Sequence, residues 1–588
     1  MTDPICKPGI PAEVAQESMS SGRASPRGRC RRSKRLALGR TLGRCSKTVT
    51  LCFFALAHAW ACGGPPQASS VIERSEPRPQ QHAVRHASAP LQERKRPDTM
   101  PPVRWIRNIA EAYTVSDSGL GVARGIDVVI EGGVITALRP ADARRPVPEG
   151  VEVIDATGLL ALPGLVDGHN HLWQVLIRGC GADMRLPEWL EHCVFPWREV
   201  PPTFEESYAL TRYAAAELVS SGVTTVVDWN HSFSQSMVAG ALAALDDSGL
   251  RYRLAVFPGL APDAAPSEFT SGPQAAEAAE QPHGACGAQH GAQHGAAVDA
   301  ACVPALAPEW VTFIETKAAA FAQQGGAPHK RLGGLHLATH PPLSESWDAR
   351  HLRATSALAQ HLGLPLNLHF HEHPSEVRSD SLAVIEAAGA TRVPLILNHA
   401  VHLSAQDIAT LGRWQTAGQG AAVIYNAQSN ARLGSGVMPL ASLQGAGCAV
   451  GLGLDGAAGD RFDAFSNLRM SIGLQRAATA HMLSIGDGLR LATLGGARAL
   501  GLDAHIGSLE VGKAADLILV DPNSPHFAFT SGAAELVLTG GPESVAWVLV
   551  SGRVLKAPAA SGRGLPSTAA LRAAAASAAQ ALYRRKPL

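Results

Sequence analysis

The sequence predicts an α/β protein built on a (β/α)8 barrel. Its 588 residues are 46% hydrophobic and 17% charged, a composition that allows a large buried core. Eight short apolar, β-branched runs alternate with alanine- or leucine-rich helical stretches, as parallel strands and covering helices do. Polar side chains capable of chemistry follow the runs, at the barrel face where active sites lie. The runs cover residues 162–171, 224–230, 252–259, 333–340, 365–372, 394–402, 421–426 and 449–455.

A leader precedes the fold, over residues 1–62. Its basic cluster is followed by an apolar stretch at 49–61 and by Cys62, an order typical of a secretion signal. The ending resembles a bacterial lipoprotein cleavage box, in which the cysteine receives the lipid. The leader predicts an exported, membrane-anchored lipoprotein. A misplaced start codon would instead leave the protein in the cytoplasm, and a disordered extension with a chance apolar patch is the third interpretation.

The flanks of the barrel carry a different pattern. Residues 63–102 have the composition of a disordered linker. Residues 103–163 alternate apolar and polar positions around a Gly132-Gly133 hairpin turn, and 505–560 repeat the alternation. We therefore expect one small β-sandwich made from both flanks, a barrel over 164–504, and a C-terminal helical tail over 561–588 with a surface helix at 567–583. Residues 262–308 read as a low-complexity insertion rather than a metal-scavenging loop.

Charge and cysteine usage exclude some functions. Lys and Arg total 51 against 50 Asp and Glu, which argues against a nucleic-acid binder. No apolar run reaches about 18 residues, so a membrane contact would come only through the lipid anchor. The five cysteines beyond the leader show no C-x-x-C pair, so we expect neither a zinc ribbon nor a disulfide framework. A homo-oligomer remains open. These cysteines are Cys180, Cys193, Cys286, Cys302 and Cys448.

Histidines and one aspartate follow four of the eight runs. Imidazole nitrogens and a carboxylate oxygen suit zinc or another borderline divalent cation. Separate core or capping histidines would not share this placement, so the pattern predicts one metal site at the barrel mouth. The groups are His169 and His171 after the first run, His369, His371 and His373 after the fifth, His399 and His402 after the sixth, and Asp455 after the eighth.

Four longer motifs resemble the amidohydrolase superfamily. They match its branch of aminohydrolases and chlorohydrolases acting on nitrogen heterocycles, which includes 8-oxoguanine deaminases, hydroxytriazine aminohydrolases and S-adenosylhomocysteine deaminase-like enzymes. The resemblance covers roughly residues 103–560. It implies a metal-dependent hydrolase with one divalent ion, zinc or alternatively iron. The motifs are PGLVDGHNH at 163–171, SNARLGSG at 429–436, ATLGGA at 492–497 and IGSLEVGKAADL at 506–517.

The resemblance also implies individual roles. The branch places acidic residues three and seven positions after its fifth-strand ligand, and His369, Glu372 and Glu376 meet that pattern. Since Pro374 stands three after His371, His371 is expected to be structural. The run at 333–340 contains no lysine that could bridge a second ion. The implied metal ligands are His169, His171, His369 and Asp455, and the implied catalytic residues are Glu372, His399 and Asp455.

These roles imply hydrolytic deamination of a purine, pyrimidine or triazine. The ion would activate water, Asp455 would accept its proton, Glu372 would carry protons to the ring and the leaving amine, and His399 would polarise the attacked centre. One alternative is hydrolysis of another C–N or C–Cl bond, as in a cyclic amide or chlorinated ring. Another is a non-catalytic, surface-tethered binding protein.

Four residues are candidates for binding a small heterocyclic substrate. Gln174 could pair with a ring lactam or cap a turn. Trp189 could stack on a planar ring or pack beneath its loop. His340 matches a pocket histidine of the branch, and Asn430 could contact substrate or serve turn chemistry.

Overall fold

The computed structural model describes residues 103–260, 306–324, 331–340, 347–459, 461–525, 527, 532–561 and 568–586. The leader with Cys62, the linker and residues 262–305 of the insertion lie outside the described residues, as do Cys286 and Cys302. No helix among the described residues is long and apolar enough to cross a membrane.

A parallel eight-stranded sheet forms the barrel, and the predicted fold class is confirmed. Neighbouring strands pair in sequence order from first to last. The Asp455 amide after the last strand donates to the His169 carbonyl of the first at 2.8 Å, which brings the two edges together. The strands are β6 Leu165–Asn170, β7 Val223–Asn230, β8 Arg251–Val256, β9 Leu335–Thr339, β10 Leu366–Phe370, β11 Leu395–His399, β12 Ala421–Tyr425 and β13 Val450–Leu452.

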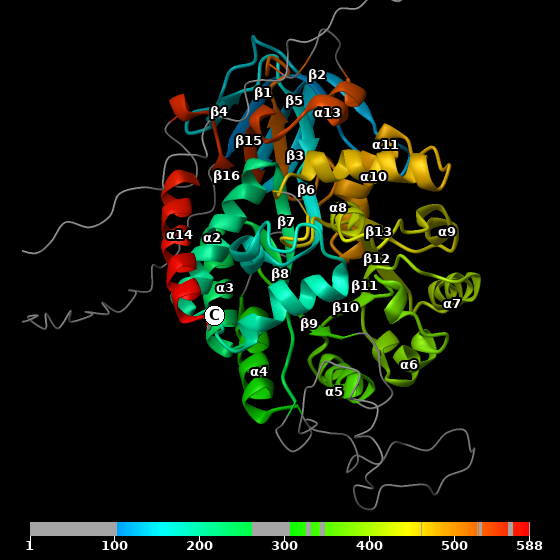
Figure 1. The fold of residues 1–588 in the computed structure, drawn as a ribbon. Helices are drawn as coiled ribbons and strands as arrows, with labels where there is room; N and C mark the ends of the chain where they lie inside the picture. Colours follow the sequence, from blue (N-terminus) through cyan, green and yellow to red (C-terminus); the bar gives the residue numbers. More distant parts are fainter. Residues whose placement is uncertain are drawn as a thin grey trace, which may run out of the picture. The chain divides into compact units, whose positions relative to one another are not determined.

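Helices surround these strands on the outside (Figure 1). Both faces of each strand are covered, which explains why the runs are continuously apolar instead of alternating. The Thr203 side chain caps the start of helix α2, and the Asp463 side chain caps the start of helix α10. Each accepts hydrogen bonds from backbone amides of the first helical turn. The helices are α2 Phe204–Ser220, α3 Gln235–Ser248, α4 Pro308–Gln323, α5 Trp347–Leu362, α6 Ser381–Ala387, α7 Ala405–Thr416, α8 Ala427–Arg432, α9 Leu440–Gly445, α10 Ala464–Ala478, α11 Ile485–Arg490, α12 Gly496–Ala499 and α13 Ala533–Thr539.

The two flanks of the chain join in a second sheet. Its strand order is β16-β15-β14-β5-β1-β2-β3, with β4 also paired to β1. Strand β5 from the first flank lies antiparallel to β14 from the second. Gly132 and Gly133 have φ of 58° and 87° in the turn between β2 and β3, a region that glycine enters freely. The bounds are β1 Arg104–Tyr113, β2 Val122–Glu131, β3 Val134–Pro140, β4 Glu152–Asp155, β5 Leu160–Pro163, β14 Leu517–Val520, β15 Val545–Val550 and β16 Arg553–Lys556.

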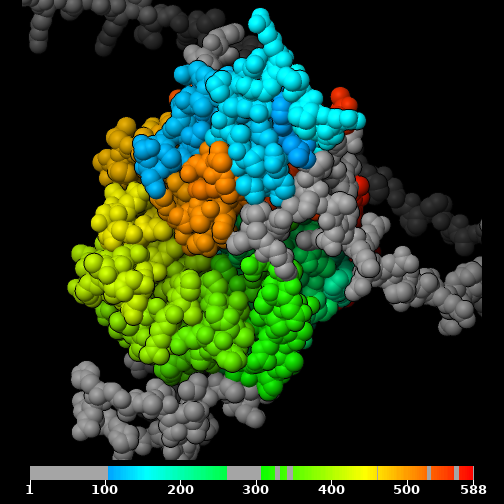
Figure 2. Space-filling view, turned by 180° about the vertical axis from the view of Figure 1, so that it is seen from behind, coloured from blue at the N-terminus to red at the C-terminus, as the bar shows by residue number. Residues whose placement is uncertain are grey.

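This sheet curls around its own apolar core. Ile106, Val128 and Leu517 belong to a buried cluster that draws residues from both flanks. A Cβ on Gly133 would lie 2.8 Å from the Ser551 carbonyl oxygen, so the first hairpin closely approaches the last one. Figure 2 shows the two flanks meeting on one face, in blue to cyan and in orange.

The chain ends in helix α14, Thr568–Arg585, which lies along α2 (Figure 1). Tyr583 donates its hydroxyl to the Leu176 carbonyl at 2.9 Å, and Leu582 is fully buried. The predicted tail helix therefore packs against the segment that follows β6.

Candidate active site

Three histidines and one aspartate converge where the barrel strands end. His171 Nε2 lies 3.3 Å from Asp455 Oδ1 and 3.3 Å from His369 Nε2. His169 Nε2 lies 3.5 Å from Asp455 Oδ1. The ligand atoms of His169, His171 and Asp455 fall within 4.8 Å of one another, as do those of His169, His369 and His399. The four predicted metal ligands thus lie next to one another, in two sets that share His169.

The protonation state of these imidazoles suits a cation. Burial lowers the pKa of His169 to about 4 and that of His369 well below its ordinary value, so both rings are neutral at pH 7. His171 Nδ1 donates a hydrogen bond to the Trp229 carbonyl oxygen at 2.6 Å. The neutral ring therefore has its lone pair on Nε2, which faces the cluster. Both ring nitrogens of His169 are buried and find no hydrogen-bond partner among the described residues. Because such groups are costly unless satisfied, the donor set fits a divalent ion.

Asp455 is held in an unusual backbone conformation. Its φ is 59°, in the left-handed region that residues other than glycine rarely adopt. Burial opposes ionisation, but the imidazoles of His169 and His171 outweigh it and keep the pKa of Asp455 well below its ordinary value. The next residue is glycine, and a Cβ on Gly456 would lie 1.8 Å from Gln174 Oε1, so any side chain there would displace this amide. The local strain therefore places an ionised carboxylate against the cluster.

Glu372 is the second carboxyl group of the site. It is 4% exposed, and its Oε2 lies 3.4 Å from His399 Nε2. Burial raises the pKa of Glu372 well above its ordinary value, and the nearby charges of Asp455 and Glu376 add to the effect. One buried carboxyl is thus pushed toward its protonated form while the other stays ionised, the division that acid and base roles require.

Asn430 determines which nitrogen of His399 carries the proton. Its amide Nδ2 donates to His399 Nδ1 at 2.9 Å and to Glu372 Oε1 at 3.2 Å. Neutral His399 must then carry its proton on Nε2, which lies 3.4 Å from Glu372 Oε2 but forms no hydrogen bond within the described part of the chain. His399 therefore presents an N–H donor to the site, whereas a metal ligand needs a lone pair. This makes His399 better suited to polarising a substrate than to binding metal.

The fifth-strand register places His369 and His371 on different sides. His369 faces the cluster, whereas His371 directs Nε2 to the Ser381 hydroxyl at 3.0 Å and stacks on Phe370. Glu376 accepts the Glu372 backbone amide at 2.8 Å and fixes the turn between them.

A cavity of about 460 Å³ opens onto the cluster. Three of the four predicted substrate-binding residues line it: Gln174, Trp189 and His340. The fourth, Asn430, is not among the lining residues and instead donates hydrogen bonds to Glu372 and His399. The cavity wall comprises His171, Gln174, Leu186, Trp189, Leu190, Phe195, Arg198, Trp229, His231, Ser232, Phe233, Phe257, Gly259, Trp310, His340, His369, Glu372, Glu376, Leu433 and Asp455.

Gln174 and Trp189 also have structural partners. Gln174 Oε1 accepts the Ala457 amide at 3.0 Å and so holds the loop that carries Asp455. Trp189 donates its indole N–H to the Cys180 carbonyl at 3.2 Å. Both side chains therefore shape the cavity as well as face it.

Sequence reasoning missed His231 and Arg198. His231 directly follows the second apolar run and would have been found by the strand-end rule used for the metal ligands. Arg198 ends a 3-10 turn, Phe195–Arg198, in the long segment after β6 and carries no motif. Its place in the wall depends on how that segment folds back.

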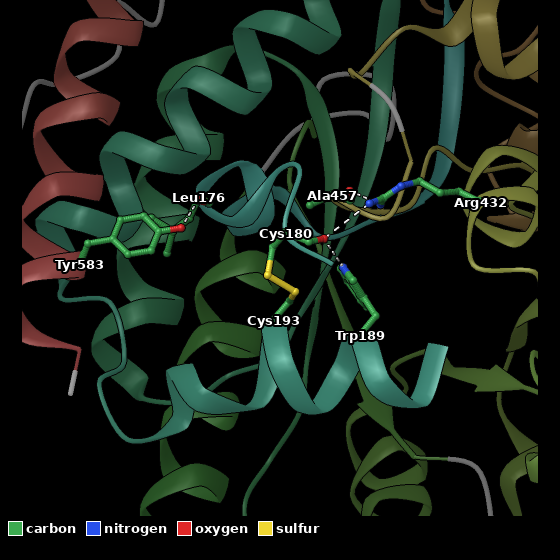
Figure 3. Close-up of a disulfide and its surroundings, with 7 residues drawn as sticks. All are labelled: Leu176, Cys180, Trp189, Cys193, Arg432, Ala457 and Tyr583. Carbon is green, nitrogen blue, oxygen red and sulfur yellow. Dashed lines mark hydrogen bonds between the residues drawn. A yellow bond between two sulfur atoms is a disulfide. The ribbon is translucent and has the colours of Figure 1, made fainter. Parts of the chain in front are cut away.

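The described residues contain one disulfide, which the cysteine spacing did not predict. Cys180 and Cys193 are bonded, with their Cα atoms 5.9 Å apart. The 13-residue separation gives no motif, because the folding of the intervening loop brings the cysteines together. Figure 3 shows Trp189 and Arg432 both directed at the Cys180 carbonyl beside this bond. The disulfide thus fixes one wall of the cavity.

A histidine and carboxylate cluster at the mouth of a parallel barrel defines the class of metal-dependent hydrolase barrels. A model of the amidohydrolase family matches residues 160–555, and the chain belongs to that family.

Among its relatives is a 5-methylthioadenosine/S-adenosylhomocysteine deaminase of Desulforudis audaxviator, 31% identical over 76% of this chain and 92% of that one. A solved zinc-bound adenosine deaminase of Xanthomonas campestris is 26% identical, with a TM-score of 0.63 over 82% of this chain and all of the other. The zinc complex of an Arthrobacter aurescens atrazine chlorohydrolase, 22% identical with a TM-score of 0.63 over 81% of this chain and all of that chain, shares the fold.

Proposed function

We propose that this protein hydrolyses the exocyclic C–N bond of an aminated nitrogen heterocycle, with a purine of the adenosine type as the leading candidate. One observation carries the proposal: a buried carboxyl with a raised pKa, Glu372, lies beside His399 and the three-histidine, one-aspartate cluster. Deaminase relatives over three quarters of the chain support the purine.

We assign the metal to His169, His171, His369 and Asp455, with zinc as the first candidate and iron as the second. A divalent ion held in this way lowers the pKa of water toward about 7. The zinc-bound adenosine deaminase supports the choice of metal.

The residues of this chain would then move protons in a fixed order. Asp455, ionised at neutral pH, accepts a proton from the attacking water. Glu372 gives its proton to the ring nitrogen beside the attacked carbon, then takes the remaining proton of the added hydroxyl and passes it to the exocyclic amine, so that ammonia leaves. The proton on Asp455 finally returns to Glu372. His399 donates its Nε2–H to the substrate atom that gains negative charge. The aromatic side chains of the wall exclude bulk water from these transfers.

The test combines metal analysis with product analysis. Purified protein should hold about one divalent ion per chain and release ammonia from adenosine, 5′-methylthioadenosine or another aminated purine. Glu372→Gln and Asp455→Asn should each lower kcat at least about 10³-fold while leaving the unfolding midpoint close to wild type. Glu309→Gln, on the exposed face of α4, is the matched control. Wild-type rates in either site variant, or release of chloride but never ammonia, would contradict the proposal.

We further propose that the protein is exported and that Cys62 carries a lipid. The Cys180–Cys193 disulfide supports export, because such bonds persist in oxidising compartments. A Cys62→Ser variant should move from the membrane fraction to the soluble fraction without detergent. An unchanged distribution would exclude the anchor.

A further inference from the structure

The segment between β6 and α2 forms one side of the cavity. We call residues 172–198 the wall segment, and none of its helical turns is longer than six residues. Turns this short contain few hydrogen bonds of their own, so the position of the wall segment depends on what packs against it. It contributes six cavity-lining residues: Gln174, Leu186, Trp189, Leu190, Phe195 and Arg198.

Tyr583 of the C-terminal helix α14 contacts both ends of the wall segment. Near the start, its hydroxyl donates to the Leu176 carbonyl at 2.9 Å (Figure 3). Near the end, its ring packs edge-on against Trp197, with the ring centroids 5.3 Å apart and the planes at 78°. Trp197 is buried and lies between the lining residues Phe195 and Arg198 in the sequence. One side chain from the end of the chain therefore connects the two ends of the wall segment.

Neighbouring residues of α14 strengthen this connection. Leu582 is fully buried, in an apolar cluster that it shares with the wall segment. Lys586 Nζ lies 5.0 Å from the centroid of the Trp197 ring, a cation–π contact. Arg585 forms an ion pair with Glu206 of α2. Helix α14 is thus attached to a barrel helix and holds the wall segment from outside.

Helix α14 reaches the catalytic groups only indirectly. All of its residues are described, and none of them lines the cavity. Its cluster includes Ala457 and Ala458, which follow Asp455 closely. Asp455 is also held by its own amide, which donates to the His169 carbonyl at 2.8 Å. Loss of the α14 contacts should therefore displace the wall segment more than it displaces Asp455.

We propose that helix α14 positions the wall segment and thereby sets the affinity for substrate, with Tyr583 as the positioning residue. The inference rests on the proposed function for the identity of the substrate. Tyr583 acts through Leu176 and Trp197 and lies outside the cavity wall. Its replacement should therefore raise KM while changing kcat little.

The first test measures amide hydrogen exchange without ligand. Tyr583→Ala removes the hydroxyl donor and the ring contact, and no large internal cavity results because this side chain is half-exposed. Exchange over residues 172–198 should become about tenfold faster, whereas exchange in the barrel strands should keep the wild-type rate. This comparison separates loosening of the wall segment from a general loss of stability.

The second test measures steady-state kinetics with adenosine and 5′-methylthioadenosine. In Tyr583→Ala, KM should rise about fivefold while kcat stays within about twofold of wild type. Tyr583→Phe keeps the ring against Trp197 and loses only the hydrogen bond to Leu176, so its KM should rise about twofold.

Tyr208→Phe is the matched control. The Tyr208 hydroxyl donates to Asp247 at 2.7 Å, a bond that joins α2 to α3 and not to the wall segment. The variant loses one hydrogen bond of the same kind, and both KM and the exchange of residues 172–198 should remain at wild-type values.

Unchanged exchange of residues 172–198 in Tyr583→Ala would overturn the inference. So would faster exchange throughout the barrel, or faster local exchange with an unchanged KM. A wild type that releases no ammonia would instead reject the proposed deamination, and the exchange of residues 172–198 alone would then decide the positioning role.

Discussion

Two groups of buried polar side chains, one at each end of the barrel, differ in how their hydrogen bonds are completed. At the N-terminal end, Asp516 accepts Arg251 Nε at 2.9 Å, Arg251 Nη2 at 3.1 Å and the Ser551 amide at 2.7 Å. At the C-terminal end, both nitrogens of His169 and the Nε2 of His399 are buried, and no described residue hydrogen-bonds to them. The first arrangement is self-sufficient, whereas the second is left incomplete by the residues that the structure describes.

This difference separates stability from function. Arg251 and Asp516 are each 2% exposed and connect the barrel strand β8 to the second sheet. A buried pair of this kind fixes how two parts of a fold meet. The groups around His169 instead include buried nitrogens without hydrogen bonds, which lowers the stability of the fold. Such groups are expected where a bound ligand or ion interacts with them. Substitutions in the Arg251–Asp516 pair should therefore lower stability, whereas substitutions around His169 should lower activity.

The largest loss of stability should follow Asp516→Asn. This substitution leaves the Arg251 charge buried without its carboxylate, and we expect the free energy of unfolding to fall by about 3–5 kcal/mol. Ammonia release per folded molecule should change little, because Asp516 lies at the end opposite the catalytic groups. Urea unfolding and the specific activity of the folded fraction measure the two effects.

Removing both charges sharpens this prediction. The double variant Arg251→Met, Asp516→Leu should recover a large part of the lost stability, since no buried charge is left unpaired. If Asp516→Asn instead abolished turnover without lowering the free energy of unfolding, the assignment of this pair to stability alone would be wrong.

A smaller effect on stability should follow loss of the disulfide. Cys193→Ser removes a cross-link between cysteines 13 residues apart. Chain entropy predicts that the free energy of unfolding then falls by about 3 kcal/mol or less. Because the bond fixes the wall that carries Trp189, KM should rise severalfold while kcat falls less. Steady-state kinetics and urea unfolding provide the measurements.

Reduction of the wild type separates geometry from side-chain identity. Mild reductant should reproduce the KM change of Cys193→Ser and should not affect that variant further. Cys448→Ser, at the buried free cysteine of the described residues, is the control. A KM unchanged by reduction would show that the wall holds its position without the bond.

The amount that the sequence predicted differs between fold and site. Parallel strands buried on both faces produce apolar runs that are visible in one dimension, so the barrel could be recognised from β6 to β13. The pairing of β5 with β14 across the chain rested on matching alternation in the two flanks. His169, His171 and Asp455 could be found because strand ends meet at one face.

Other features depend on contacts that no local pattern encodes. Asn430 was predicted as a substrate contact or a turn residue, and its amide bridges His399 at the end of β11 and Glu372 just after β10. Arg198 and the Cys180–Cys193 bond lie in the irregular segment after β6, where neither helical nor strand periodicity applies. Sequence reasoning therefore located the reacting groups better than the wall that selects the substrate.

The smallest expected effect concerns pH and Lys556, also at the stabilising end. Burial lowers the pKa of Lys556 to about 8 from the ordinary 10.5, although its Nζ donates to the Ser220 and Pro542 carbonyls at 2.8 Å each. Between these two values the unfolded chain binds more protons than the folded one, so this lysine makes the folded state more stable as pH rises. Relative to Lys556→Met, the wild type should gain about 1 kcal/mol between pH 8 and 9. Urea midpoints of both proteins across that interval measure the gain, and a parallel pH dependence would mean that the amine is solvated and charged throughout.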